Sequence, residues 1–180
     1  RAIQTRAVRD GDDWILNGTK LWISGADRAD YGLVFARTGG PGRNGVTCFI
    51  VETDSPGFKV ARIVHTLRSA KYATEIHLDN LRVPDKNILG KEGAGFAIAN
   101  DRLSRQRIPY AAECVGVAMR AHEMAVEYSK QRETFGATLS SRQGIQWMLV
   151  ESEVDIRSMR WLVLDAAARA DRGESFRTES

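Results

Sequence analysis

The sequence has few cysteines and prolines and no long apolar run. Its two cysteines, Cys48 and Cys114, cannot form the disulfide framework that stabilises small secreted domains. Free thiols in apolar surroundings favour a reducing compartment, either the bacterial cytoplasm or the mitochondrial matrix. No apolar run is long enough to span a bilayer, so we expect no membrane-spanning segment.

The charges show no bias toward one sign. Lysine and arginine number 26 against 23 aspartates and glutamates, which gives a net charge of only +3. The two signs are interspersed, which argues against a dedicated nucleic-acid surface. The hydrophobic fraction of 43% and the charged fraction of 27% are ordinary for a globular chain and exclude a disordered tail.

The common catalytic and nucleotide-binding motifs are missing as well. The chain contains no G-x-S-x-G, no Walker loop, no H-E-x-x-H and no C-x-x-C. His65, His77 and His122 are scattered, so we predict no metal site. The Gly93-Ala94-Gly95 segment has only part of a G-x-G-x-x-G pattern and follows no buried parallel strand, which leaves a Rossmann interpretation weak.

The first half of the chain has the pattern of β-strands. Short apolar runs at residues 14–16, 21–23, 31–36, 46–51, 58–64 and 76–83 are separated by turn residues. Asn17-Gly18, between the first two runs, is a strong hairpin signal because both residues tolerate positive φ. The spacing predicts a small antiparallel barrel or sandwich.

The second half has the period of α-helices. Apolar residues recur at helical spacing over residues 108–126 and 145–166, which predicts two long helices. We expect Pro109 to kink the first helix or to mark where it restarts, and Ser140-Ser141 to cap the second. Gly136 is expected to stop the first helix. Two such helices need further helices to cover their apolar faces, either from a further part of the same polypeptide or from another subunit.

Three clusters invite a functional interpretation beside a plainer one. Trp22 and Ser24, at the end of a strand, could stack on and hydrogen-bond a planar ring, or they are a half-buried tryptophan and a turn. Arg132 and Phe135 could grip a diphosphate and pack on a ring, or they are a basic helix end followed by a glycine. The basic run over residues 104–107 could serve an anionic ligand or simply face water. Together the clusters suggest a large, flat, phosphorylated ligand.

Several motifs in order resemble those of the acyl-CoA dehydrogenases, FAD-dependent enzymes that introduce an α,β double bond into acyl-CoA thioesters. The matching segments lie at residues 17–24 (NGTKLWIS), 56–58 (PGF), 83–84 (VP), 87–90 (NILG), 92–96 (EGAGF) and 132–136 (RETFG), with Gln143 after them. The resemblance covers nearly the whole chain, and this order is more specific than any single motif.

The resemblance implies an α+β multidomain fold. Residues 1–86 would form an antiparallel β-barrel domain, the middle domain of the family. Residues 87–180 would form the first part of an α-helical domain of the four-helix-bundle type. Because the chain starts at Arg1 and stops in polar residues after a helix, we expect a fragment that lacks the family's N-terminal domain and the rest of the bundle.

The resemblance also assigns cofactor-binding roles. Trp22, Ile23 and Ser24 would lie along the flavin ring of FAD, with the Ser24 hydroxyl bonded near its reactive nitrogen. Cofactor contacts from a neighbouring subunit would come from the later motif, with Arg132 at the diphosphate, Thr134 and Phe135 beside it and Gln143 at the adenosine portion. A homo-oligomer, tetramer or dimer, is therefore expected.

Substrate contacts follow in the same way. Arg107 matches an arginine near the acyl-CoA site, and Ser104, Arg105 and Gln106 flank it at substrate-contacting positions. A minority of the family carries its catalytic glutamate at the position of Gln106, but an amide cannot take a proton at neutral pH. Glu113 lies about two turns after Gln106 on the same helix, and we expect it to have a structural or packing role. We therefore expect the base beyond Ser180.

Two further positions depart from the family pattern. Arg142 stands where an aromatic residue or a histidine often precedes the glutamine, and residues 69–74 fit the usual R-x-S/T pattern poorly. Both affect the finer contacts to CoA and FAD.

The function implied is flavin-dependent dehydrogenation of an acyl-CoA thioester, with electrons passed to an electron-transfer flavoprotein. Two alternatives stay open. One is an acyl-CoA oxidase or flavin monooxygenase-like relative on the same fold, which oxygen reactivity would distinguish. The other is a non-catalytic assembly module.

Overall fold

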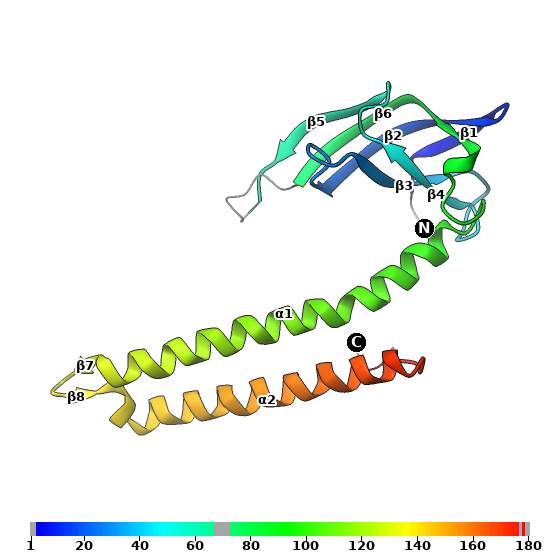
Figure 1. Ribbon diagram of the computed structural model, residues 1–180. Coiled ribbons are helices and arrows are strands. Elements are labelled where there is room, and N and C mark those ends of the chain that lie inside the picture. Colours follow the sequence, from blue (N-terminus) through cyan, green and yellow to red (C-terminus); the bar gives the residue numbers. More distant parts are fainter. Residues whose placement is uncertain (1–2, 67–72, 177, 179–180) are drawn as a thin grey trace. The chain divides into compact units, whose positions relative to one another are not determined.

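The computed structural model describes residues 3–66, 73–176 and 178. By its internal contacts the chain divides into two compact units, Arg1–Asn100 and Asp101–Ser180. A sheet-forming unit followed by a helical one confirms the predicted fold class (Figure 1). The predicted domain boundary after residue 86 stays a prediction.

The first unit contains one six-stranded sheet in the order β4-β3-β1-β2-β6-β5. Its strands are β1 (Arg6–Asp10), β2 (Asp13–Ser24), β3 (Tyr31–Arg37), β4 (Val46–Glu52), β5 (Phe58–Val64) and β6 (Ala73–Pro84). All neighbours pair antiparallel except β1 and β3, which meet at one parallel position.

The sheet is not the closed barrel that we predicted. Within the described residues its end strands, β4 and β5, do not pair with each other. The chain after the short 3-10 helix η1 (Asp85–Asn87) bonds to β4 instead, with the Leu89 amide donating to the Cys48 carbonyl at 2.9 Å. An edge that is covered by a connecting segment does not need a strand partner.

The core of this unit lies on the inward face of the strands. Leu16, Phe49 and Leu81 have no exposed surface, and the Trp14 ring packs edge-on against Phe49 with centroids 5.7 Å apart. The indole nitrogen of Trp14 donates to Asp85 at 2.7 Å, which satisfies its polar group.

The hairpin predicted at Asn17-Gly18 is wrong, because β2 runs straight through both residues. The real turn joins β1 to β2 at Gly11, whose φ is +62°. Gly18 has a φ of +147°, and a Cβ there would lie 2.8 Å from the Thr5 backbone. The glycine therefore serves a close approach of chain inside the sheet, not a reversal.

The second unit is a helical hairpin. Helix α1 (Gly95–Gln131) and α2 (Gln143–Asp171) run antiparallel, joined by the two-residue strands β7 (Glu133–Thr134) and β8 (Ala137–Thr138) and the 3-10 helix η2 (Leu139–Ser141) (Figure 1). Helix α1 continues through Pro109 without a restart. Helix α2 buries only Ile156 and Ala166, while Trp161 and Leu162 are 72% and 61% exposed.

Neither helix, over the residues that the structure describes, has a stretch long and apolar enough to cross a membrane.

The backbone geometry at Gly57, in the motif at residues 56–58, requires a glycine. Its φ is +91°, and a Cβ there would lie 2.4 Å from the Asp79 carbonyl oxygen and 3.0 Å from Leu81. We expect Gly57→Ala to destabilise the protein by roughly 2 to 4 kcal/mol, through left-handed strain and a backbone clash. Urea unfolding followed by tryptophan fluorescence measures the loss.

Gly32→Ala is the matched control, because Gly32 lies in β3 and a Cβ there meets nothing within 4 Å. Its effect should stay within about 1 kcal/mol. Equal losses in the two variants would contradict the clash at Gly57.

Candidate functional site

A β-bulge near the end of β2 places Trp22. Lys20 pairs with Ile76 and Ile23 pairs with Thr74, so two residues of β2 face the single Glu75 of β6. Trp22 takes a left-handed φ of +64° and is 60% exposed. A bulky residue in this conformation is an outlier, and such outliers concentrate at functional sites.

Ile23 and Ser24 continue the strand after the bulge. The Thr74 hydroxyl, itself fully buried, donates to the Ile23 carbonyl at 2.9 Å and so anchors the strand after the indole. The Ser24 side chain is exposed at the strand end. Both residues line a pocket of about 310 Å³ within this unit.

Lys20 is a pocket residue to which the sequence analysis gave no role. Its ammonium lines the same pocket and donates to the Phe35 carbonyl at 2.7 Å. Burial lowers the pKa of this lysine, because desolvation disfavours its charged form. A signal was available in the sequence, since the two-residue alternation of a strand puts Lys20 on the inward face with Trp14 and Leu16.

The tip of the β7–β8 hairpin presents Phe135 to solvent. Phe135 and Gly136 have φ values of +51° and +73°, the two left-handed central residues of a tight hairpin turn. The Phe135 side chain is 99% exposed. Gly136 thus belongs to this turn, and the prediction that it stops α1 is wrong, since α1 ends at Gln131.

The base of the hairpin holds the other predicted cofactor residues of the helical unit. Arg132 follows α1 directly, and its carbonyl accepts from Leu139 at 2.9 Å across the hairpin. Gln143 is the first residue of α2, and both its side chain and that of Arg132 are exposed. The structure therefore brings Arg132, Thr134, Phe135 and Gln143 to the hairpin and the helix start beside it.

The predicted caps of α2 are wrong. Ser140 and Ser141 lie in η2, where the Ser141 hydroxyl donates back to the Thr138 carbonyl at 2.7 Å. The N-cap of α2 is Arg142, which makes no side-chain capping bond.

The predicted substrate residues lie elsewhere on α1. Ser104, Arg105, Gln106 and Arg107 are roughly 36 Å along the helix from the hairpin, at 1.5 Å per residue. Arg105 is paired with Asp101 at 3.2 Å, and Ser104 and Gln106 are half-buried. Of residues 69–74, which fit the family's R-x-S/T pattern poorly, residues 69–72 lie outside the described residues, and Thr74 belongs to β6.

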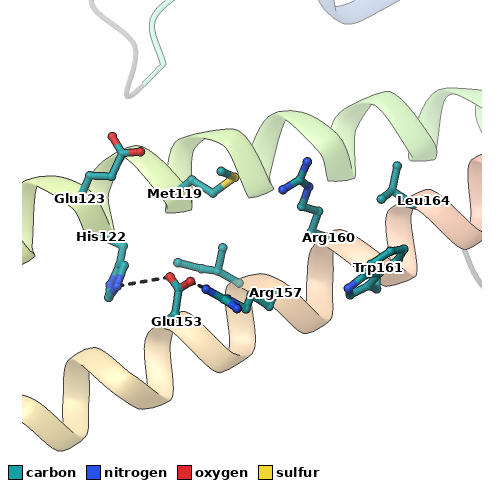
Figure 2. A pocket seen from close by; sticks show the side chains of 9 residues that line it. Met119, His122, Glu123, Glu153, Arg157, Arg160, Trp161 and Leu164 are labelled. Atoms are coloured by element: carbon teal, nitrogen blue, oxygen red, sulfur yellow. Dashed lines mark hydrogen bonds and ion pairs between the residues drawn. The ribbon is translucent and has the colours of Figure 1, made fainter.

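A second pocket, of about 560 Å³, lies between α1 and α2 (Figure 2). His122 of α1 points across to Glu153 of α2, with Nε2 3.5 Å from the carboxylate, and the Arg157 Nε donates to Glu153 at 2.6 Å. The hydrogen bond from Arg157 holds the pKa of Glu153 below its ordinary value, and the charges of Arg157 and His122 add to this. Across the part of the chain that the structure describes, no cluster of side chains is suited to hold a metal ion.

Comparisons with known proteins agree across nearly the whole chain. The family model of the acyl-CoA dehydrogenase middle domain matches residues 1–81, and that of the acyl-CoA dehydrogenase C-terminal domain matches residues 93–180. The chain belongs to the acyl-CoA dehydrogenase family.

Individual members of the acyl-CoA dehydrogenase family and proteins of the same fold also match nearly the whole chain. A probable acyl-CoA dehydrogenase of Mycobacterium leprae is 39% identical over 96% of the chain and 45% of its own length. The structure of butyryl-CoA dehydrogenase from Megasphaera elsdenii matches with a TM-score of 0.92 and 37% identity, over 98% of this chain and 47% of that one. PigA with FAD and proline matches with a TM-score of 0.94 and 27% identity, over 98% and 47%. The chain thus spans about half the length of the relatives that it matches.

Glu153 makes stability depend on pH in a defined direction. Its folded pKa lies below the ordinary 4.5, so its stabilising contribution is complete above 4.5 and is lost as the pH falls through the lowered value. We expect Glu153→Gln to lower the urea midpoint at neutral pH and to match the wild type at acid pH. Urea unfolding at a series of pH values measures the difference.

Glu151→Gln changes the same charge at an exposed position of α2 and serves as the control. A difference between wild type and Glu153→Gln that stays constant with pH would contradict the assignment.

Proposed function

We propose that the protein containing this chain is an FAD-dependent acyl-CoA dehydrogenase that introduces an α,β double bond into an acyl-CoA thioester. The observation that carries the proposal is Trp22, a strand residue whose backbone is left-handed and whose indole is exposed. The Ser24 hydroxyl follows two residues later. Folding alone favours burying an indole in a sheet, so its presentation to solvent fits a role in binding a planar ring.

The residues of the first unit fit the ring of a flavin. Trp22 offers a flat apolar face, and Ser24 offers one hydroxyl that can donate to a ring nitrogen. Ile23 between them is fixed through its carbonyl by the Thr74 hydroxyl, so the strand is anchored between the two proposed flavin contacts.

The hairpin of the second unit fits the dinucleotide end of FAD. Arg132 presents an exposed guanidinium suited to a diphosphate, and Phe135 presents a fully exposed ring. Thr134 and Gln143 add polar groups beside them. In our proposal these residues reach the cofactor of a neighbouring subunit, so that a homo-oligomer is required for a complete site.

Bound FAD supplies the acceptor for the hydride that leaves the β-carbon of the thioester. Arg107 and the neighbouring Ser104, Arg105 and Gln106 would orient the CoA thioester. Gln106 cannot accept the α-proton, because a neutral amide is not a base. A carboxylate beyond Ser180 would take that proton, and an electron-transfer flavoprotein would receive the electrons. The M. leprae and M. elsdenii relatives are bacterial, which favours the bacterial cytoplasm as compartment.

A visible absorption spectrum tests the function directly. We expect the purified full-length protein to carry a flavin that bleaches anaerobically with one member of a panel of acyl-CoAs. Flavin that bleaches and then reoxidises rapidly in air would favour the oxidase alternative. A protein without flavin would overturn the proposal and favour an assembly module.

Ser24→Ala tests the flavin contact. We expect the rate of flavin reduction by substrate to fall about tenfold, since one hydrogen bond to a developing charge is lost. Stopped-flow absorbance at the flavin band measures the rate. Ser55→Ala, in the turn between β4 and β5, removes a hydroxyl of the same size and should leave the rate unchanged. Equal rates for Ser24→Ala and the wild type would contradict the contact.

A further inference from the structure

The β7–β8 hairpin is too short to be stable through its own strand pairing. Strands β7 and β8 have two residues each, and an isolated hairpin of this size is unstable in water. Phe135 at the tip is 99% exposed, so its own burial does not hold it. The hairpin is held by contacts at its base, among them the Leu139–Arg132 backbone hydrogen bond and the contacts of Arg142.

Arg142 is itself anchored by backbone bonds. Its amide donates to the Leu139 carbonyl at 3.0 Å, and its carbonyl accepts from Ile145 and Gln146 at 3.0 and 3.1 Å as α2 begins. The backbone of Arg142 is therefore fixed by η2 on one side and by α2 on the other.

From this anchor the side chain reaches back across the hairpin. One terminal nitrogen donates to the Thr134 carbonyl, and the guanidinium lies over the Phe135 ring, 5.7 Å from its centroid. A planar guanidinium can make both contacts at once, whereas an ammonium makes a point contact. Arg142 thus ties together two of the residues proposed to contact the dinucleotide.

The Nε of Arg142 is the one donor of this side chain that is buried and has no hydrogen-bond partner within the described residues. Buried donors normally find an acceptor. This Nε–H is shielded from solvent, so the side chain acts through its terminal nitrogen and the face of its guanidinium.

We propose that Arg142 is a positioning residue that holds Thr134 and Phe135 in place for binding FAD. The inference rests on the proposed function, since it takes the hairpin as part of the dinucleotide site. Holding the ring before the ligand arrives reduces the ordering that binding must otherwise impose. Arg142 therefore acts on affinity through Phe135.

A double-mutant cycle in the full-length protein tests this, with FAD dissociation constants from reconstitution of the apoprotein. We expect Arg142→Leu to weaken FAD binding about tenfold, and Arg142→Lys to recover only part of that loss. In a Phe135→Leu background the same Arg142→Leu change should cost less than about threefold, because the partner ring is gone. Losses of equal size in both backgrounds would overturn the proposal.

Arg120→Leu is the control for charge, since Arg120 lies on α1, where its guanidinium pairs with the helix neighbour Glu123 at 3.2 Å. It should leave FAD affinity unchanged. Thermal midpoints of all variants separate a general loss of stability from the coupling to Phe135.

A fluorine label keeps this inference separate from the proposed function. With 4-fluorophenylalanine at position 135, Arg142→Leu should shift and sharpen the ¹⁹F resonance without FAD, because the ring is released from the guanidinium. An unchanged signal overturns the contact. A wild-type protein that binds no FAD overturns the proposed function, and the ¹⁹F signal still decides whether Arg142 holds the hairpin.

Discussion

The pairing of β2 with β6 is the interaction on which the first unit depends. The two twelve-residue strands align from Asp13 opposite Pro84 to Ser24 opposite Ala73. Alternate residues of both strands enter the core, and this burial fixes the register, since a slip of one residue would turn the apolar side chains outward. The indole of Trp22 is presented because the ladder continues on both sides of one bulge. A site built on a paired strand keeps its geometry better than one built on a free loop.

Short apolar runs bounded by turn residues were enough to place β3, β4, β5 and β6 within a few residues of their observed bounds. The turn signal of Asn17-Gly18 was misleading, because a local preference for a turn competes there with pairing along the whole of β2. The ladder prevails because it satisfies backbone groups and buries side chains on both sides of the glycine. That the sheet stays open could not be predicted from the sequence, because the segment at Leu89 that bonds to β4 has no strand pattern.

The candidate site was predictable to a different degree at each residue. The motif located Trp22 and Ser24, but the left-handed backbone that exposes the indole depends on register with β6, which is a long-range property. Lys20 could have been assigned inward from strand parity alone. Arg142 was visible in the sequence as a departure from the family. Its contact with Phe135 was not, since it requires the turn at Gly136 to fold the hairpin back toward the start of α2.

The helical unit places the hairpin that we propose to bind the cofactor at the end of two helices that cannot cover their own apolar faces. Trp161 and Leu162 on α2 are largely exposed, as are Leu103 and Val117 on α1, both 64%. Apolar surface of this extent is stable in water only when other helices or another subunit cover it. Whatever covers these faces also fixes α1 and α2, and with them the base of the hairpin that carries Arg132. If the hairpin binds the cofactor of a neighbouring subunit, then each bound cofactor stabilises the assembly and the assembly strengthens cofactor binding by the same free energy.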